Sequence, residues 1–145
     1  MRAVRSPDGE TVSAMQRNKG AAGERELFAL LGNELGYIVR RGLGAARDGG
    51  ADCLDVPGWA IECKRCETWS NAFWNQTTAQ AEATGRKPAL FWRQSRKPWA
   101  VIVDVADLSS TAPMGRYTAT ISLECWCALV REHAAMRRNE TALSP

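Results

Sequence analysis

Residues 51–64 read ADCLDVPGWAIECK, two short apolar runs separated by a proline and a glycine. Pro57-Gly58 is a strong turn signal, because both residues favour backbone conformations that interrupt helices and strands. The flanking runs, Cys53–Val56 and Trp59–Cys63, are short, apolar and compatible with β-structure. The pattern therefore predicts a β-hairpin.

Charged side chains occur on both arms of this predicted hairpin. Because side chains alternate between the two faces of a strand, Glu62 and Lys64 are expected on one face, and Trp59, Ile61 and Cys63 on the other. A half-buried strand rarely places a carboxylate and an ammonium group side by side without a use for them. Asp52 lies across the turn, within reach of the same patch. Two carboxylates and a lysine at one strand edge suit a hard divalent cation beside a scissile phosphate.

The composition is that of an ordinary globular protein. The chain has 145 residues, enough for one domain with a real hydrophobic core, and is 45% hydrophobic and 24% charged. No run approaches the roughly 18 apolar residues of a membrane span, and no apolar segment of a secretory signal follows the arginine-rich N-terminus. These features predict a cytoplasmic protein without a membrane partner. The net charge of +3 is compatible with a nucleic-acid partner but is weak evidence for one.

The five cysteines are an odd number, which fits a reducing cytoplasm better than a disulfide framework. An alternative is a four-thiolate zinc site made by Cys63-x-x-Cys66 and Cys125-x-Cys127. It is disfavoured because Cys63 should face the core, and because residues two apart in a helix, such as Cys125 and Cys127, do not share a face. The single histidine, His133, argues against histidine-based catalysis.

Hydrophobic periodicity and turn signals divide the rest of the chain into elements. Residues 1–17 lack periodicity and are predicted to be a flexible arm, followed by a single domain over 18–145. That domain is expected to have a core at about 19–104 and a strand–helix extension at 105–145. Helices are predicted at 19–35, 69–84 and 122–138, and further strands at 37–41, 89–93, 99–103 and 116–121. This order predicts an α/β fold with a central mixed β-sheet flanked by α-helices.

The first predicted helix carries a charge on its apolar stripe. The stripe recurs at three- and four-residue steps through Leu27, Phe28, Leu31 and Leu35. Glu24 lies on the same stripe, so its carboxylate must either sit at the rim of the core or have a cationic partner. Glu26 and Glu34 fall elsewhere on the helical wheel and are expected to be solvated.

The residues Glu24, Asp52, Glu62 and Lys64 resemble, in order and context, the core of the PD-(D/E)XK nuclease superfamily. More narrowly, the chain is similar to the archaeal-type Holliday junction resolvases and their phage and bacterial relatives. The similarity spans about 19–104 and rests on KGAAGEREL at 19–27, GYIVRR at 36–41, IECK at 61–64 and GRKPAL at 85–90. It implies a restriction-endonuclease-like core. A bare Asp…Glu-x-Lys pattern is a weak signature, but the surrounding motifs make it fairly specific.

The residue types suit phosphodiester hydrolysis. Asp52 and Glu62, with the backbone carbonyl of Cys63, can bind Mg²⁺ or Mn²⁺ through oxygen atoms. Glu24 could complete the site directly or through water. Such a cation lowers the pKa of bound water and clamps phosphate oxygens. Lys64 would orient or help to deprotonate the nucleophile, or stabilise charge in the transition state.

The resemblance adds candidates for catalysis and for DNA contact. Related nucleases often present a glutamine from the second helix, where Gln76 and Gln80 are one turn apart, and Gln76 is slightly preferred. Arg25 and Arg41 would bind phosphate near the site. The candidate DNA contacts are Lys19, Arg25, Arg41, Arg47 and Arg96. Arg47 lies in the glycine-rich loop 42–50 and Arg96 at the tip of a hairpin, so a flexible loop and a merely polar tip are the alternatives for these two.

The expected function is that of a Mg²⁺-dependent DNA endonuclease that acts on branched DNA, as a homodimer, in a phage-infected or bacterial cell. Two alternatives stay open: a nuclease that cuts ordinary duplex or single-stranded DNA, and a DNA-binding module that kept the fold and lost catalysis. The presence of all four core residues argues against the second. Two departures from the pattern concern Gly50-Ala51, where proline is usual before the aspartate, and 79–83, which lack the aromatic residues of the dimer.

Overall fold

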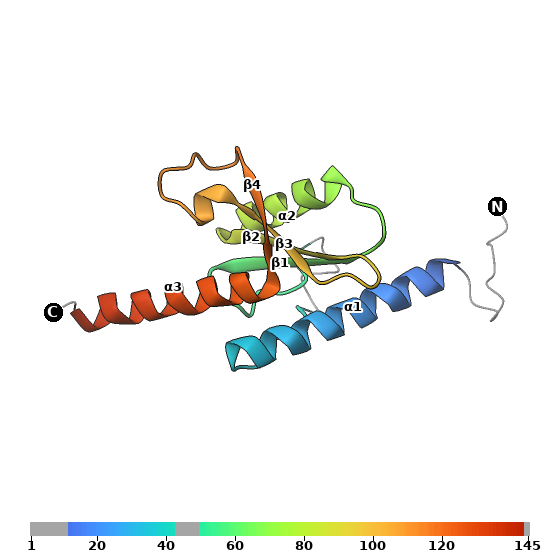
Figure 1. The fold of residues 1–145 in the computed structure, drawn as a ribbon, viewed down its shortest axis with the longest axis horizontal. Coiled ribbons are helices and arrows are strands. Elements are labelled where there is room, and N and C mark those ends of the chain that lie inside the picture. Colours follow the sequence, from blue (N-terminus) through green and yellow to red (C-terminus); the bar gives the residue numbers. More distant parts are fainter. Residues whose placement is uncertain (1–11, 43–49, 144–145) are drawn as a thin grey trace.

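The computed structural model describes residues 12–42 and 50–143, with side chains from residue 20 onward. The elements are α1 (Val12–Leu35), β1 (Trp59–Arg65), α2 (Asn71–Thr84), β2 (Lys87–Arg93), β3 (Ala100–Asp104), the 3₁₀ helix η2 (Val105–Asp107), β4 (Thr118–Ser122) and α3 (Leu123–Leu143). Figure 1 shows α1 and α3 along one side of the sheet and α2 on the other. Within the described ranges, no helix is long and apolar enough to cross a bilayer.

The sheet is mixed, and its topology places β1 at an edge. The strand order is β1-β2-β3-β4, with β1 parallel to β2 and the other two pairs antiparallel. Helix α2 makes the crossover that a parallel pair requires. The predicted α/β class, a central mixed sheet flanked by helices, is confirmed. On the outer edge of β1, Ile61 pairs with Cys53 in a single antiparallel bridge.

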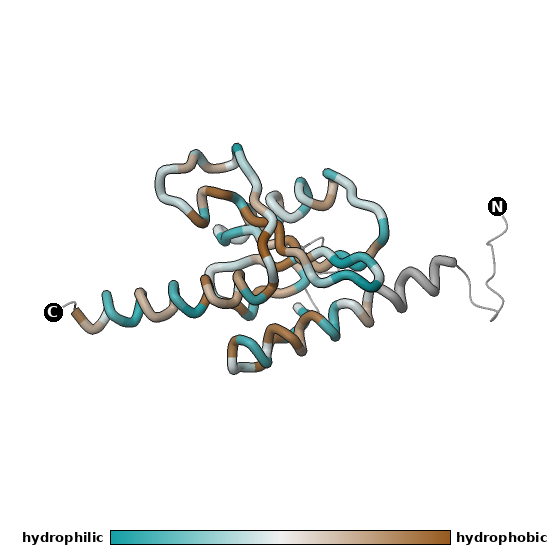
Figure 2. Tube along the Cα trace, in the orientation of Figure 1, coloured by the Kyte–Doolittle hydropathy of each residue, from teal (hydrophilic) through white to brown (hydrophobic). Residues whose placement is uncertain are grey.

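The main hydrophobic core fills the space between the sheet and the pair α1 and α3. Trp126 of α3 is fully buried at its centre, with edge-on ring contacts to Trp59 at 5.3 Å and to Phe91 at 5.0 Å between centroids. In Figure 2 the hydrophobic segments gather where the strands cross the middle of the molecule. The extension after residue 104 therefore supplies part of the core through α3 and is not an appendage.

The alternation predicted for β1 is confirmed. Ile61 and Cys63 lie in the core beneath α1 and α3, together with Trp59. Ala60 lies on the opposite face, in a small cluster with Ala81 of α2. Because side chains alternate along a strand, Glu62 and Lys64 share the α2 face with Ala60.

The predicted strand at 37–41 is wrong. Residues 38–41 have no regular secondary structure, and Ile38 is 74% exposed. Two backbone N–H groups here bond to the segment around Asp52, but not as a ladder. Gly42 donates to the backbone carbonyl of Asp52 at 2.7 Å, and Arg40 donates to the carboxylate of Asp55 at 2.7 Å. The Arg40 N–H thus bonds to a side chain and not to a neighbouring strand, and segment 37–41 does not form a strand although its sequence favours one.

The first arm of the predicted hairpin, Cys53–Val56, does not form a strand beyond Cys53. The guanidinium of Arg86 hydrogen-bonds to carbonyl groups of this arm. The Arg86 Nη1 donates to the backbone oxygens of Leu54 at 2.7 Å, Trp59 at 3.2 Å and Val56 at 3.5 Å. These carbonyls are satisfied by a guanidinium, which permits a loop where a second strand was predicted. Arg86 is therefore a structural clamp on the turn at Pro57.

Three helix ends differ from the prediction, and a local capping signal explains one of them, the start of α2. Helix α1 begins at Val12, seven residues before the predicted start at Lys19 and inside the predicted arm. Helix α2 begins at Asn71, two residues late, because the hydroxyl of Ser70 caps it and accepts from the Ala72 N–H at 3.3 Å. Helix α3 continues to Leu143, beyond the predicted end at 138. Residues 1–11 and 43–49 lie outside the described ranges.

The prediction that Glu26 is solvated is wrong. Its carboxylate pairs with the guanidinium of Arg93 at the end of β2 and accepts from the Trp99 indole N–H at 3.2 Å. Arg93 Nε also donates to the Lys97 carbonyl at 2.9 Å. Glu26 thus ties α1 to the β2–β3 turn, a contact between residues 67 or more positions apart.

Two glycines of α1 are expected to respond oppositely to alanine. A Cβ at Gly23 would lie 2.9 Å from the Cβ and 3.0 Å from the Cδ of Arg65, whereas a Cβ at Gly20 would meet nothing within 4 Å. Gly20→Ala should stabilise by up to about 1 kcal/mol through helix propensity. Gly23→Ala should lose that gain to overpacking and destabilise by roughly 1 kcal/mol or more. Urea unfolding of both variants tests this, and equal stabilisation by both would contradict it.

Candidate functional site

The free edge of β1 fixes Asp52 beside the strand. Ile61 and Cys53 exchange both backbone hydrogen bonds, at 3.0 and 3.2 Å, so these groups of Ile61 point outward from the sheet. Two residues on, the Cys63 N–H also points outward and donates to the Asp52 carboxylate at 2.9 Å. The Cys63 carbonyl faces the same edge, because the N–H and C=O of one strand residue point to the same side. A carboxylate and a carbonyl oxygen therefore converge at this edge.

Glu62 is the most deeply buried acid of the site. It is 3% exposed, and its Oε1 lies 3.3 Å from the Lys64 ammonium. Its Oε2 is buried and has no hydrogen-bond partner among the residues that the structure describes. The Lys64 ammonium also lies over the ring of Phe73 on α2, 5.4 Å from the ring centroid. Phe73 was not among the residues predicted from sequence.

Glu24 has the cationic partner that its place on the apolar stripe required. Its Oε2 lies 2.8 Å from the Nε of Arg41, and its side chain is 14% exposed. This contact is an ion pair, and the oxygen has no hydrogen-bond partner within the described ranges. Arg25 and Arg41 line a groove of about 620 Å³ between α1 and the segment 36–41. Arg41 thus both lines this groove and pairs with Glu24.

Burial raises the pKa values of all three acids, and neighbouring acids add to the rise at Glu62 and Glu24. Burial, and then the negative charge of Asp52, raise the pKa of Glu62 to about 7, against the opposing effect of Lys64. Burial is also the main cause that raises the pKa of Asp52 and of Glu24, and Asp52 adds to the rise at Glu24. Lys64 lowers all three pKa values and Arg41 lowers two of them, but their effect does not outweigh that of burial.

The donors at this edge fit a hard divalent cation. The donor atoms are all oxygens, from Asp52, Glu62 and the Cys63 carbonyl, which is the chemistry that Mg²⁺ and Mn²⁺ prefer. The buried Oε2 of Glu62 has no hydrogen-bond partner among the described residues, and a cation bound at this edge would give it one. In the described conformation, no three or more His, Cys, Asp or Glu side chains come together around a metal-sized position. Glu24 instead pairs with Arg41, and its participation stays a prediction.

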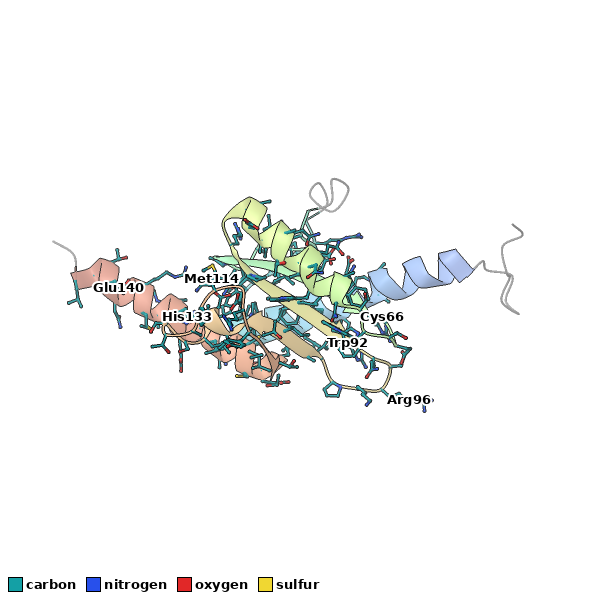
Figure 3. The ribbon with its side chains drawn as sticks, turned by 90° about the horizontal axis from the view of Figure 1, so that it is seen from above. Cys66, Trp92, Arg96, Met114, His133 and Glu140 are labelled. Carbon is teal, nitrogen blue, oxygen red and sulfur yellow. The ribbon has the colours of Figure 1, made fainter. Side chains whose placement is uncertain are left out.

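The other predicted site residues differ in their exposure, and two of them have no described side chain. Gln80 is 7% exposed and lies on the sheet side of α2, whereas Gln76 is exposed. Burial therefore favours Gln80 as the glutamine of the site, although the sequence analysis slightly preferred Gln76. Arg96 has a left-handed backbone with φ of 63° and projects from the β2–β3 turn in Figure 3. The side chains of Lys19 and Arg47 lie outside the described part of the structure. The predicted burial of Cys63 in the core is confirmed.

Metal-free protein is expected to lose stability as the pH rises from about 5 to 8. Between the unfolded pKa of 4.5 and the folded pKa of about 7, the folded state keeps a proton on Glu62 that the unfolded state has released. Raising the pH therefore favours unfolding, and Asp52 and Glu24 act in the same direction. Burial lowers the pKa of His133, which acts oppositely.

Urea unfolding in EDTA across this pH range measures the effect, and comparison with Glu62→Gln removes the contribution of His133. The difference in unfolding free energy between the two proteins should grow with pH by a few kcal/mol. A difference that does not change between pH 5 and 8 would show that the Glu62 carboxyl is not perturbed.

A family model and a solved structure match this chain. Residues 15–125 match the model of a family described as "Phage putative PDDEXK endonuclease". No curated protein sequence matches the chain. Among solved structures, the chain is similar to Hjc, a Holliday junction resolvase from the archaeal hyperthermophile Archaeoglobus fulgidus. The identity is 20% and the TM-score 0.45, over 72% of this chain and 84% of that one.

Proposed function

The chain belongs to the PDDEXK endonuclease family of phages, and on that premise we propose that it is a metal-dependent endonuclease that hydrolyses DNA phosphodiester bonds. The observation that carries the proposal is the edge of β1. There the Asp52 carboxylate accepts a hydrogen bond at 2.9 Å from the backbone N–H of Cys63, the residue between Glu62 and Lys64, which form an ion pair. Burial raises the pKa of both acids, as expected for a site that is completed by a cation.

In this proposal Asp52, Glu62 and the Cys63 carbonyl hold Mg²⁺ or Mn²⁺, with Glu24 completing the site directly or through water. A divalent cation bound there supplies Lewis-acid stabilisation of charge on the phosphate and makes the attacking water more acidic. The backbone N–H of Cys63 keeps Asp52 oriented through its 2.9 Å hydrogen bond. Gln80 is the better-placed candidate for the supporting glutamine, because it is buried on the sheet side of α2 and Gln76 is exposed.

Lys64 acts on the nucleophile or on the developing charge. Its ammonium is 3.3 Å from Glu62 and is only 27% exposed, so it is held in the site and still reached by water. From there it orients the attacking water or helps to deprotonate it, and donates to phosphate oxygens as their charge grows.

DNA would lie along the groove beside Glu24. Arg25 and Arg41 border this groove of about 620 Å³ and would contact backbone phosphates. Arg96 is exposed at the β2–β3 turn and is a further candidate contact. Lys19 and Arg47 remain candidates from sequence.

Branched DNA is the proposed substrate, and the enzyme is proposed to be a cytoplasmic homodimer with a single domain over residues 18–145. The support is the sequence resemblance of residues 19–104 to the archaeal-type junction resolvases. A nuclease that cuts ordinary duplex or single-stranded DNA is the alternative. Both kinds of nuclease would use the same site residues, so only a comparison of DNA substrates distinguishes them.

Cleavage of a four-way junction and of a matched linear duplex, each with Mg²⁺ or with EDTA, tests the proposal. We expect Mg²⁺-dependent cutting of the junction and slower cutting of the duplex. Absence of metal-dependent cleavage of both would refute the nuclease, and equal rates on both would refute junction selectivity. A size measurement in solution tests the dimer.

A further inference from the structure

Three aromatic side chains surround the Lys64 end of β1 on the α2 side. The aromatic cluster, as we call it, consists of Trp69, Phe73 and Trp92. Trp69 meets Phe73 edge-on at 5.8 Å between centroids, and Trp92 at 5.3 Å. All three rings are half-buried. The cluster lies outside the main core, which is on the opposite face of the sheet.

Hydrogen bonds fix the orientation of the two indoles. The Trp92 N–H donates to the Cys66 carbonyl at 3.2 Å, and Figure 3 shows these two residues close together. The Trp69 N–H donates to the side-chain oxygen of Asn71 at 3.1 Å. Because both polar ends are anchored, the ring of Phe73 packs against a rigid partner and is held in one place.

Phe73 presents its ring to the Lys64 ammonium at a distance typical of a cation–π contact. The ammonium is 5.4 Å from the ring centroid, within the roughly 6 Å over which such contacts are attractive. Its other contact is the Oε1 of Glu62 at 3.3 Å. A lysine side chain is flexible, so with Glu62 alone the ammonium would have one restraint.

Glu62 is not a dedicated partner for Lys64. The proposed cation would share the same carboxylate, which weakens its attraction for the ammonium. Another acid in place of Phe73 would add negative charge to a cluster in which Asp52 and Glu24 already raise the pKa of Glu62. A neutral ring attracts the ammonium without that cost, because the negative face of its π-system carries no net charge.

We propose that Phe73 is a positioning residue that keeps the Lys64 ammonium in the site independently of Glu62, and that Trp69 and Trp92 hold Phe73 in place. The inference rests on the proposed role of Lys64 in DNA cleavage. Phe73 itself touches no reacting atom. Phe73 lies outside the family motif and is supplied by α2, the helix that connects β1 to β2.

The test compares Phe73→Leu, which removes the ring and keeps an apolar side chain, with Phe73→Tyr, which keeps the ring. In single-turnover cleavage, Phe73→Leu should slow the reaction about tenfold with unchanged DNA affinity, since small misplacements of a catalytic group are costly. Phe73→Tyr should stay within about twofold of wild type. Trp74→Leu, which removes a half-buried aromatic ring from the next position of the same helix, is the matched control and should retain the wild-type rate.

A second readout needs neither metal nor DNA. In NMR spectra of the metal-free protein, the ring of Phe73 should shift the ε-methylene signals of Lys64 upfield, and these signals are assigned by their loss in Lys64→Ala. The shift should persist in Phe73→Tyr and disappear in Phe73→Leu, with all variants shown to be folded by circular dichroism.

The inference and the proposed function fail in different ways. Absence of cleavage by wild-type protein overturns the proposed function. Absence of the upfield shift in wild-type protein overturns the inference, whatever the activity. A wild-type cleavage rate for Phe73→Leu, or a loss of rate that follows entirely from weaker DNA binding, also overturns it.

Discussion

Glu62→Gln is expected to lower the rate of DNA cleavage by about 1,000-fold or more. Glutamine keeps the size and shape of the side chain but removes the negative charge that would bind the cation and that pairs with Lys64 at 3.3 Å. An amide oxygen is a much weaker ligand for a hard divalent ion than a carboxylate. The loss should therefore appear in the chemical step, measured in single-turnover cleavage with saturating protein.

The same substitution is expected to stabilise the metal-free fold at pH 8. A buried carboxylate beside Asp52 opposes folding when it is ionised, and the amide relieves that repulsion. Glu82→Gln on the exposed side of α2 is the matched control and should change neither cleavage nor stability. If Glu62→Gln lost stability together with activity, its effect on cleavage would be a consequence of misfolding, and the assigned role of Glu62 would lack support.

Trp126→Ala is expected to lower the free energy of unfolding by about 3–5 kcal/mol. Trp126 is 0% exposed and packs edge-on against Trp59 of β1 and Phe91 of β2. Removing the indole would leave a large cavity at the point where α3 meets the sheet. Urea unfolding measures the loss, and a value below about 1 kcal/mol would show that the site collapses around the smaller residue.

Trp126→Phe separates the packing of this residue from its polar group. The indole N–H of Trp126 is buried and has no hydrogen-bond partner in the described part of the chain, which opposes folding. Phenylalanine removes that group and keeps a ring, so its cost should be much smaller than that of alanine. Equal losses for the two variants would mean that the N–H has a partner and contributes to stability.

Local patterns in the sequence were sufficient for β1 and for the C-terminal end of α2. A period of two assigns Ile61 and Cys63 to the core and Glu62 to the opposite face, whatever the rest of the fold is. Gly85 marks the C-terminal end of α2 because capping depends on neighbouring backbone groups alone. The position of Glu24 on an apolar stripe likewise required a cation, although its identity as Arg41 came from the structure.

Contacts between distant residues were not predictable in this way. The sequence at 37–41 looks like a strand, but the edge of β1 is taken by Cys53, and Asp55 accepts from the Arg40 N–H. Arg86 binds carbonyls of Leu54 and Val56, about 30 residues earlier in the chain. No local pattern indicates such partners, because the energy that selects them exists only after the sheet has formed.

The sequence by itself determined the composition of the candidate site: two acids and a lysine in and beside one strand, a third acid on the first helix, and the side of the strand on which each strand residue lies. These follow from backbone periodicity, which is local. The tertiary structure decided how the charges of the site are balanced. It placed Asp52 on the Cys63 N–H, Arg41 beside Glu24, and Phe73 over Lys64. Electrostatic and ring contacts depend on distances through space, and only the folded chain sets those distances.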